Sequence, residues 1–185
     1  MPPEFIPAHG GYESLLSYRK SLIVFRGTKT FCRRFLSHGN RTIDQMVQAA
    51  RSGKQNIIEG SMALGTSTET EIKLTGVARA SLEELLEDYR DYARDHGAGV
   101  WLSHSPEVSW IRKFGRSHND YEDYREFFET RMAAVVANIA ICVIHQTNYL
   151  LDSQLRELQR KFVTAGGIRE RMSRARRAYR DGRAE

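Results

Sequence analysis

The residues best suited to chemistry in this chain are arginines near its C-terminal end, within residues 168–183 (IRERMSRARRAYRDGR). A guanidinium group offers a planar fork of N–H donors that can bind a phosphate through two parallel hydrogen bonds. Several such contacts release counterions from a polyanion, so this kind of binding weakens steeply with salt. The sequence therefore predicts a nucleic-acid interface in the tail. Its candidate residues are Arg169, Arg171, Arg174, Arg176, Arg177, Arg180 and Arg183, assisted by the basic residues Arg51 and Lys54.

Placed on a helix, the same segment also has an apolar stripe, which spans about 60° at about 100° per residue. The stripe consists of Ile168, Met172, Ala175 and Tyr179. It could dock on a helix bundle, its own or a neighbour's, while the arginines pair with acidic residues. Nucleic-acid contact and docking both stay open, and they are compatible. Because the stripe is short and lacks Trp and Leu, we do not expect it to bind a membrane.

Other chemical motifs are weak. Gly53-Lys54 lacks the upstream glycine and the following Ser/Thr of a phosphate loop and falls within a predicted helix. Cys142 and His145 share a helix face, but no second Cys/His pair accompanies them as a metal site would need. The acidic residues between Glu83 and Asp95 alternate with arginines, as on a solvated helix face. We therefore predict no enzyme, no metal and no cofactor.

Composition favours a single all-α domain with an appendage. The chain has 185 residues and four prolines, and no run of alternating β-branched residues. Residues 1–11 lack the apolar segment of a signal peptide, and the apolar stretch at 132–144 is shorter than the roughly 20 residues that span a bilayer. Cys32 and Cys142 are expected to be buried thiols rather than a disulfide. A cytoplasmic protein is the expectation.

Net charge is unevenly distributed along the chain. Residues 154–185 hold ten Lys/Arg and four Asp/Glu, a net +6, whereas the whole chain carries +5. Residues 1–153 therefore carry −1. The basic character belongs to the tail.

Helical periodicity predicts four long helices. The first covers 12–36, with Gly27 at its middle; the second begins at an N-cap Thr42 and runs to about Leu64. Thr66 or Ser67 caps the third, which ends before the glycines at 97 and 99. Small residues at 49–61 should let the second and third helices approach closely. Asn119 or Asp120 starts a fourth helix that continues to about Phe162, after a short helix opened by Ser105-Pro106-Glu107.

The predicted fourth helix is apolar on two sides. Val136, Cys142 and Val143 lie on one side, and Ala137 and Ile144 lie on the other. One apolar face packs in the core of the protomer. A monomeric four-helix bundle would leave the second apolar face uncovered. We infer self-association. The alternative is that residues 100–117 cover the second face within one chain.

Residues 45–89 also resemble a known family over about forty positions. The segments QAARSGKQNIIEGSMALGTSTETEIK and ARASLEELLEDY are similar to the signature of the four-helix-bundle proteins encoded by ribosomal-RNA intervening sequences, which include accessory proteins of diversity-generating retroelements. The matching residues are Ala49, Ala50, Asn56, Ile57, Glu59, Gly60, Ser67, Ala78, Arg79, Ser81, Leu82, Glu84 and Leu85. The tail resembles the C-terminal suffix extension of one subgroup. The resemblance implies a homo-oligomer, often a pentamer, without catalysis, with nucleic acid and a reverse transcriptase or other nucleic-acid enzyme as partners.

Together these observations predict an antiparallel, up-down four-helix bundle with a basic helical extension. The expected parts are a flexible N-terminal arm at 1–11, the bundle at 12–153 and the arginine-rich extension at 154–185. Its expected function is non-enzymatic binding of RNA or DNA through the tail. The alternative is a structural assembly module whose tail locks neighbouring subunits.

Overall fold

The protein is all-α, as predicted. The computed structural model describes residues 11–37, 39, 41–63 and 67–182, and the regular structure of these residues is entirely helical. The elements are η1 (Tyr12–Ser14), α1 (Leu16–Phe35), α2 (Arg41–Ala63), α3 (Thr68–Asp95), α4 (Pro106–Ser117), α5 (Tyr121–Thr130), α6 (Ala133–Ala165) and α7 (Ile168–Asp181). Four predictions fall wholly or largely on residues outside this described part. They concern the N-terminal arm at 1–10, the helix end at Leu64, the helix cap at Thr66 and the candidate site residue Arg183.

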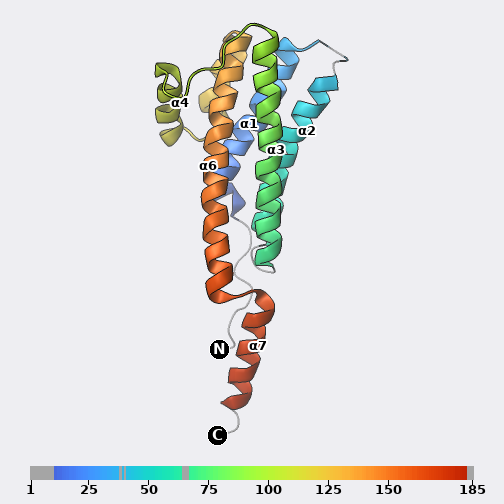
Figure 1. Ribbon diagram of the computed structural model, residues 1–185, viewed down its shortest axis with the longest axis vertical. Coiled ribbons are helices and arrows are strands. Elements are labelled where there is room, and N and C mark those ends of the chain that lie inside the picture. The colour runs from blue at the N-terminus through green and yellow to red at the C-terminus, as the bar shows by residue number, and fades with distance from the viewer. Residues whose placement is uncertain (1–10, 38, 40, 64–66, 183–185) are drawn as a thin grey trace.

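Four long helices lie side by side (Figure 1). Helix α2 packs against α3, α3 against α6, and α1 against both α6 and α2. Their apolar faces meet in one core that includes the fully buried Phe31, Leu82, Tyr89, Val143 and Leu151. We call α1 to α6 the helical body. Helix α7 extends from one end of it (Figure 1).

Several helix ends follow from the capping residues. The Ser67 side chain accepts a hydrogen bond from the Thr70 N–H at 3.1 Å, and Ser105 accepts one from the Val108 N–H at 3.3 Å. Asp120 caps α5, and its own N–H donates to the Asp123 carboxylate at 3.1 Å. Thr42 is not a cap, because α2 already begins at Arg41.

Small residues bring α2 and α3 together, as predicted. A Cβ atom on Gly53 would lie 2.8 Å from the side chain of Leu82, which is closer than carbon atoms can pack. Beside this contact the Ser52 and Ser81 hydroxyls are 2.9 Å apart and hydrogen-bonded across the helix pair. Glycine at 53 is therefore required by the packing of Leu82.

The prediction of one unbroken fourth helix is wrong. The backbone is extended at Arg131 and Met132, which separates α5 from α6. The buried stripe of α5 (Tyr121, Tyr124, Phe128) packs on α1, whereas α6 packs against α1, α3 and α4. The break lets the two helices take these separate positions in the body.

Gly27 shows where α5 packs on α1. A side chain on Gly27 would overlap the Phe128 ring, so the missing Cβ creates the seat for this aromatic residue. The glycine therefore contributes a helix contact, and its low helix propensity is offset by the burial of Phe128, which is 1% exposed.

Both apolar sides of α6 are covered within the single chain. Ile139, Ile141, Cys142 and Ile144 are all buried, with α4 packed along α6. The alternative interpretation, in which residues 100–117 cover the second face, accounts for this burial. Self-association is consequently no longer needed to explain the apolar face, and it stays a prediction from the resemblance.

A buried lysine fixes the α4–α5 region to α1. Lys20 is 3% exposed and donates to the carbonyl oxygens of Gly115 at 2.7 Å and His118 at 2.9 Å, and to the Tyr124 hydroxyl at 3.2 Å. Burial lowers the pKa of Lys20 to about 8. These hydrogen bonds replace the water that surrounds the ammonium group in the unfolded chain.

Helix α6 is continuous across residues 153 and 154, where we placed the start of the extension, and Leu158 is still buried. The chain changes direction only at Gly166-Gly167. Both cysteines are free and buried, as predicted.

Candidate nucleic-acid interface

The arginine-rich segment is a separate helix that leaves the body at a glycine elbow. Gly166 ends α6 with φ of +72°, a conformation that favours glycine. A side chain at 166 would also overlap the Glu170 carboxylate. That carboxylate accepts a hydrogen bond from the Gly167 N–H at 3.1 Å and so holds the first turn of α7. The two glycines thus set the direction in which α7 leaves α6.

Helix α7 has no buried residue. The two large side chains of its apolar stripe are partly exposed, Met172 by 46% and Tyr179 by 61%, whereas Ile168 and Ala175 are half-buried. Within the described part of the chain, the tail is therefore not docked in a way that buries this stripe.

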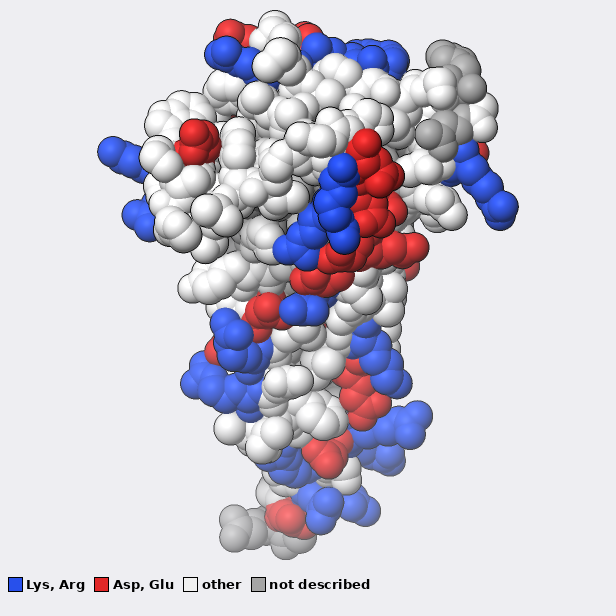
Figure 2. All heavy atoms as spheres, turned by 45° about the horizontal axis from the view of Figure 1, so that its top comes forward, with Lys and Arg blue, Asp and Glu red and all other residues white. Residues whose placement is uncertain are grey.

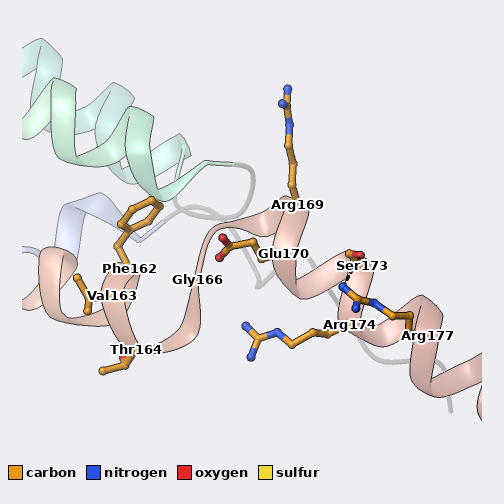
Figure 3. A pocket seen from close by; sticks show the side chains of 9 residues that line it. All are labelled: Phe162, Val163, Thr164, Gly166, Arg169, Glu170, Ser173, Arg174 and Arg177. Atoms are coloured by element: carbon orange, nitrogen blue, oxygen red, sulfur yellow. Dashed lines mark hydrogen bonds between the residues drawn. The ribbon is translucent and has the colours of Figure 1, made fainter.

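At the elbow, α6 and α7 border an open notch of about 720 Å³, and three of the arginines are among its lining residues (Figure 3). Arg174 extends back towards the elbow, Arg177 lies beside Ser173, and Arg169 points away from both. The only carboxylate among the described lining residues is that of Glu170. Cations thus dominate a concave site large enough for a phosphate group and part of its sugar or base.

Arg169, Arg171, Arg176, Arg177 and Arg180 of α7 make few polar contacts with other described residues. Arg177 donates to the Ser173 hydroxyl at 3.3 Å, and the buried Nε of Arg171 has no hydrogen-bond acceptor. Among the residues that the structure describes, no carboxylate forms an ion pair with Arg169, Arg176 or Arg180. Figure 2 shows basic side chains crowded over this end of the molecule.

The two candidate residues on α2 are not part of this cluster. Arg51 is exposed and Lys54 is half-buried, with its ammonium group 5.6 Å from the centre of the Phe25 ring. Neither lines the notch beside α7. The structure therefore brings together the tail arginines but leaves Arg51 and Lys54 on the side of the body.

The charges of the body are arranged differently. On α3, Arg90 pairs with Glu87 and Arg94 with Asp91, each at 2.5 Å, which confirms the predicted solvated face. These pairs form the acidic band with interspersed basic groups in Figure 2. Arg79 bridges from α3 to Asp152 of α6 at 2.5 Å.

The Cys142 and His145 pair lacks the features of a reactive or metal site. Burial raises the pKa of the Cys142 thiol to about 11, which keeps it protonated near neutral pH. Within the described residues no group of three or more His, Cys, Asp or Glu side chains could hold a metal ion.

Sequence reasoning missed the concave shape of the elbow and its other lining residues, among them Phe162, Thr164 and Ser173. The available signal was Gly166-Gly167, a glycine pair that can end a helix and turn the chain. Helix α6 also contains an 18-residue window that is long and apolar enough to cross a membrane by composition, longer than the stretch we identified. Because 67% of that window is buried by neighbouring helices, it has the character of a core helix.

Comparison with known proteins gives no match to a family model, a curated protein or a solved structure.

Proposed function

We propose that this protein is a non-enzymatic accessory factor that binds RNA or DNA through the arginines of α7. One observation carries the proposal: α7 leaves the body with no buried residue, and most of its arginines lack a carboxylate partner among the described residues. Cations that form no internal ion pair are available to an external polyanion. The resemblance alone adds a reverse transcriptase or another nucleic-acid enzyme as a partner. We also propose a cytoplasmic location, which rests on the sequence of residues 1–11 and on the short apolar stretch at 132–144.

The chemistry of α7 suits phosphates better than bases. Arginines occur on the flank of Arg169, Arg176 and Arg180 and also on the side of Arg171 and Arg174, so the helix presents cations over most of its polar surface. Such a distribution favours contacts with the sugar–phosphate backbone, which carry no sequence information. We expect binding that is strongly salt-dependent and weakly sequence-dependent.

We further propose that the body is an antiparallel, up-down four-helix bundle of α1, α2, α3 and α6 that assembles into a homo-oligomer. The cyclic packing of these four helices supports the first part. The resemblance supports the second and suggests a pentamer. In a ring the tail would be repeated, so that weak contacts from each copy add through effective concentration.

The test compares the full chain with a chain that ends after Gly166. Because no described residue of α7 belongs to the buried core, the truncated chain should keep the helices and the melting temperature of the body. Fluorescence anisotropy with a generic labelled RNA at several salt concentrations measures affinity. We expect binding by the full chain that falls with salt, and little binding by the truncated chain. Equal affinity of the two chains would remove α7 from the mechanism.

The exposed apolar stripe favours a second function, in which α7 locks neighbouring subunits together. Met172 and Tyr179 are the large side chains that would be buried in such an assembly. In that case, truncation after Gly166 would lower the oligomer mass measured by analytical ultracentrifugation, and neither chain would bind RNA. A loss of RNA binding at constant mass would favour the first function.

A further inference from the structure

A second concave site lies on the helical body, far along the chain from α7. It is a groove of about 1110 Å³ between α6, α4 and the connection at 100–103. Val108, Trp101, Ile141 and Cys142 make most of it apolar, and no Asp or Glu is among its described lining residues. Figure 2 shows a mostly uncharged surface between α4 and the acidic band of α3.

The groove is lined by several neutral polar side chains, among them Asn138 and Gln146, and its charged groups are all cationic. Arg112 and Arg116 both line it from α4, and Arg90 enters from α3. Arg112 donates to the Ser103 carbonyl oxygen at 2.9 Å, and among the described residues neither Arg112 nor Arg116 has a carboxylate within ion-pair distance. The two arginines are four residues apart on one helix face, a spacing at which like charges destabilise a helix.

His145 lies on α6 in the same groove and reports its electrostatic potential. Burial and then the charge of Arg90 lower the pKa of His145; Glu83 acts in the opposite direction, and Arg112 lowers it further. Arg90 is paired with Glu87, whereas Arg112 and Arg116 are cations of the groove that have no carboxylate partner among the described residues.

Apolar walls with an uncompensated pair of arginines fit a ligand that is apolar along its body and negative at one end. Pockets of small molecules are typically 300–1,000 Å³, mostly apolar, with a few placed polar groups. The tail of a second copy does not fit, because α7 carries arginines on both sides of its apolar stripe. A helix about 10 Å wide also suits an enclosed groove less well than a compact molecule.

We propose that the groove between α4 and α6 binds a small amphiphilic anion, a carboxylate or sulfonate on an aliphatic or aromatic body, with Arg112 and Arg116 holding the acid group. The body of the ligand lies against Trp101, Val108 and Ile141. The proposal is independent of nucleic-acid binding by α7.

The groove has a built-in reporter, because Trp101 lines it and Trp110 does not. In a Trp110→Phe background, titration with laurate below its micelle concentration should change Trp101 fluorescence to a saturating value. Laurate should also displace the fluorescent sulfonate 1-anilinonaphthalene-8-sulfonate. Dodecanol, with the same chain and no charge, should bind more weakly than laurate.

The decisive variant is Arg112→Gln/Arg116→Gln in that background, with Lys113→Gln as the matched control. Lys113 is exposed on the same helix and does not line the groove. We expect the double variant to bind laurate about tenfold more weakly and without preference over dodecanol, because charge-assisted hydrogen bonds are removed. The control should bind like the parent. Far-ultraviolet circular dichroism checks the fold of each.

Three results would overturn the proposal. The first is equal binding of laurate and dodecanol to the parent chain. The second is unchanged laurate affinity in the double variant. The third is no binding of laurate together with binding of an acidic amphipathic peptide or of phosphatidylglycerol vesicles that depends on Arg112 and Arg116. That result would assign the groove to a macromolecule or a membrane surface.

Discussion

Arginines of the helical body and arginines of α7 are the same residue type in two opposite settings. In the body, Arg79 bridges two helices through Asp152, and Arg34 donates to the carbonyl oxygens of Phe128 and Arg131 at the break between α5 and α6. On α7, Arg169, Arg176 and Arg180 meet no carboxylate among the described residues, and the helix they sit on buries nothing. Arg79 and Arg34 therefore join helices of the body, whereas Arg169, Arg176 and Arg180 form no ion pair within the described part of the chain.

The largest expected effect is a loss of stability on substitution in the core of the body, compared with a substitution on α7. Leu82 is fully buried and packs on Gly53, so Leu82→Ala should lower the free energy of unfolding by about 2–5 kcal/mol. Met172→Ala, on the exposed stripe of α7, should change it by less than about 0.5 kcal/mol. Urea unfolding followed by circular dichroism measures both. A similar destabilisation of the two variants would mean that α7 is packed and that the contrast is false.

This contrast was only partly visible in the sequence. The caps at Ser67, Ser105 and Asp120 and the turn glycines at 97 and 166 mark helix ends locally, so most of the helices could be predicted. The break at Arg131-Met132 carries no proline or glycine. The break accompanies the packing of α5 on α1, which is a tertiary contact that the local sequence does not reveal.

The residues of the candidate site could be predicted from the sequence, but the direction in which α7 leaves the body could not. The arginines and the apolar stripe of α7 are evident from helical spacing, but that spacing is equally compatible with a docked helix. Only the elbow at Gly166 and the exposure of Met172 separate the two arrangements. The groove beside α4 could not be predicted, because Arg90, Arg112 and His145 come together through the packing of three helices.

A second prediction concerns a buried carboxyl group of the body, in contrast to the exposed arginines of α7. Glu71 is 4% exposed, its Oε2 has no hydrogen-bond partner, and burial raises its pKa to about 7 despite Lys161 and Gln154. The folded state therefore holds a proton that the unfolded chain releases near pH 4.5, and stability falls between about pH 4.5 and 7.

Glu71→Gln should remove this penalty. At pH 8 the variant should be more stable than the parent by about 1–3 kcal/mol, and at about pH 4 the two should be equal. Chemical denaturation at both pH values provides the measurement, with the exposed Glu69→Gln as the control. Equal stabilisation at the acidic and the basic pH would show that ionisation of Glu71 is not its cause.

A third and smaller effect compares one arginine from each region. Arg79→Ala breaks the bridge to Asp152 and should cost about 1 kcal/mol, discounted because both side chains are more than a third exposed. Arg176→Ala should change stability by less than about 0.5 kcal/mol. Thermal unfolding of both variants tests this. A larger cost for Arg176 than for Arg79 would place the α7 arginine inside the folded structure.

The most direct test of the central claim is the salt dependence of RNA binding in two triple variants of equal charge. Arg169→Gln/Arg176→Gln/Arg180→Gln neutralises α7 while keeping a helix-forming side chain. Arg33→Gln/Lys113→Gln/Arg131→Gln neutralises exposed cations of the body. The account predicts that only the α7 variant binds more weakly, and that its plot of log K against log salt flattens by about 0.7–0.9 for each phosphate that it no longer neutralises. Equal slopes and equal affinities for the two variants would contradict it.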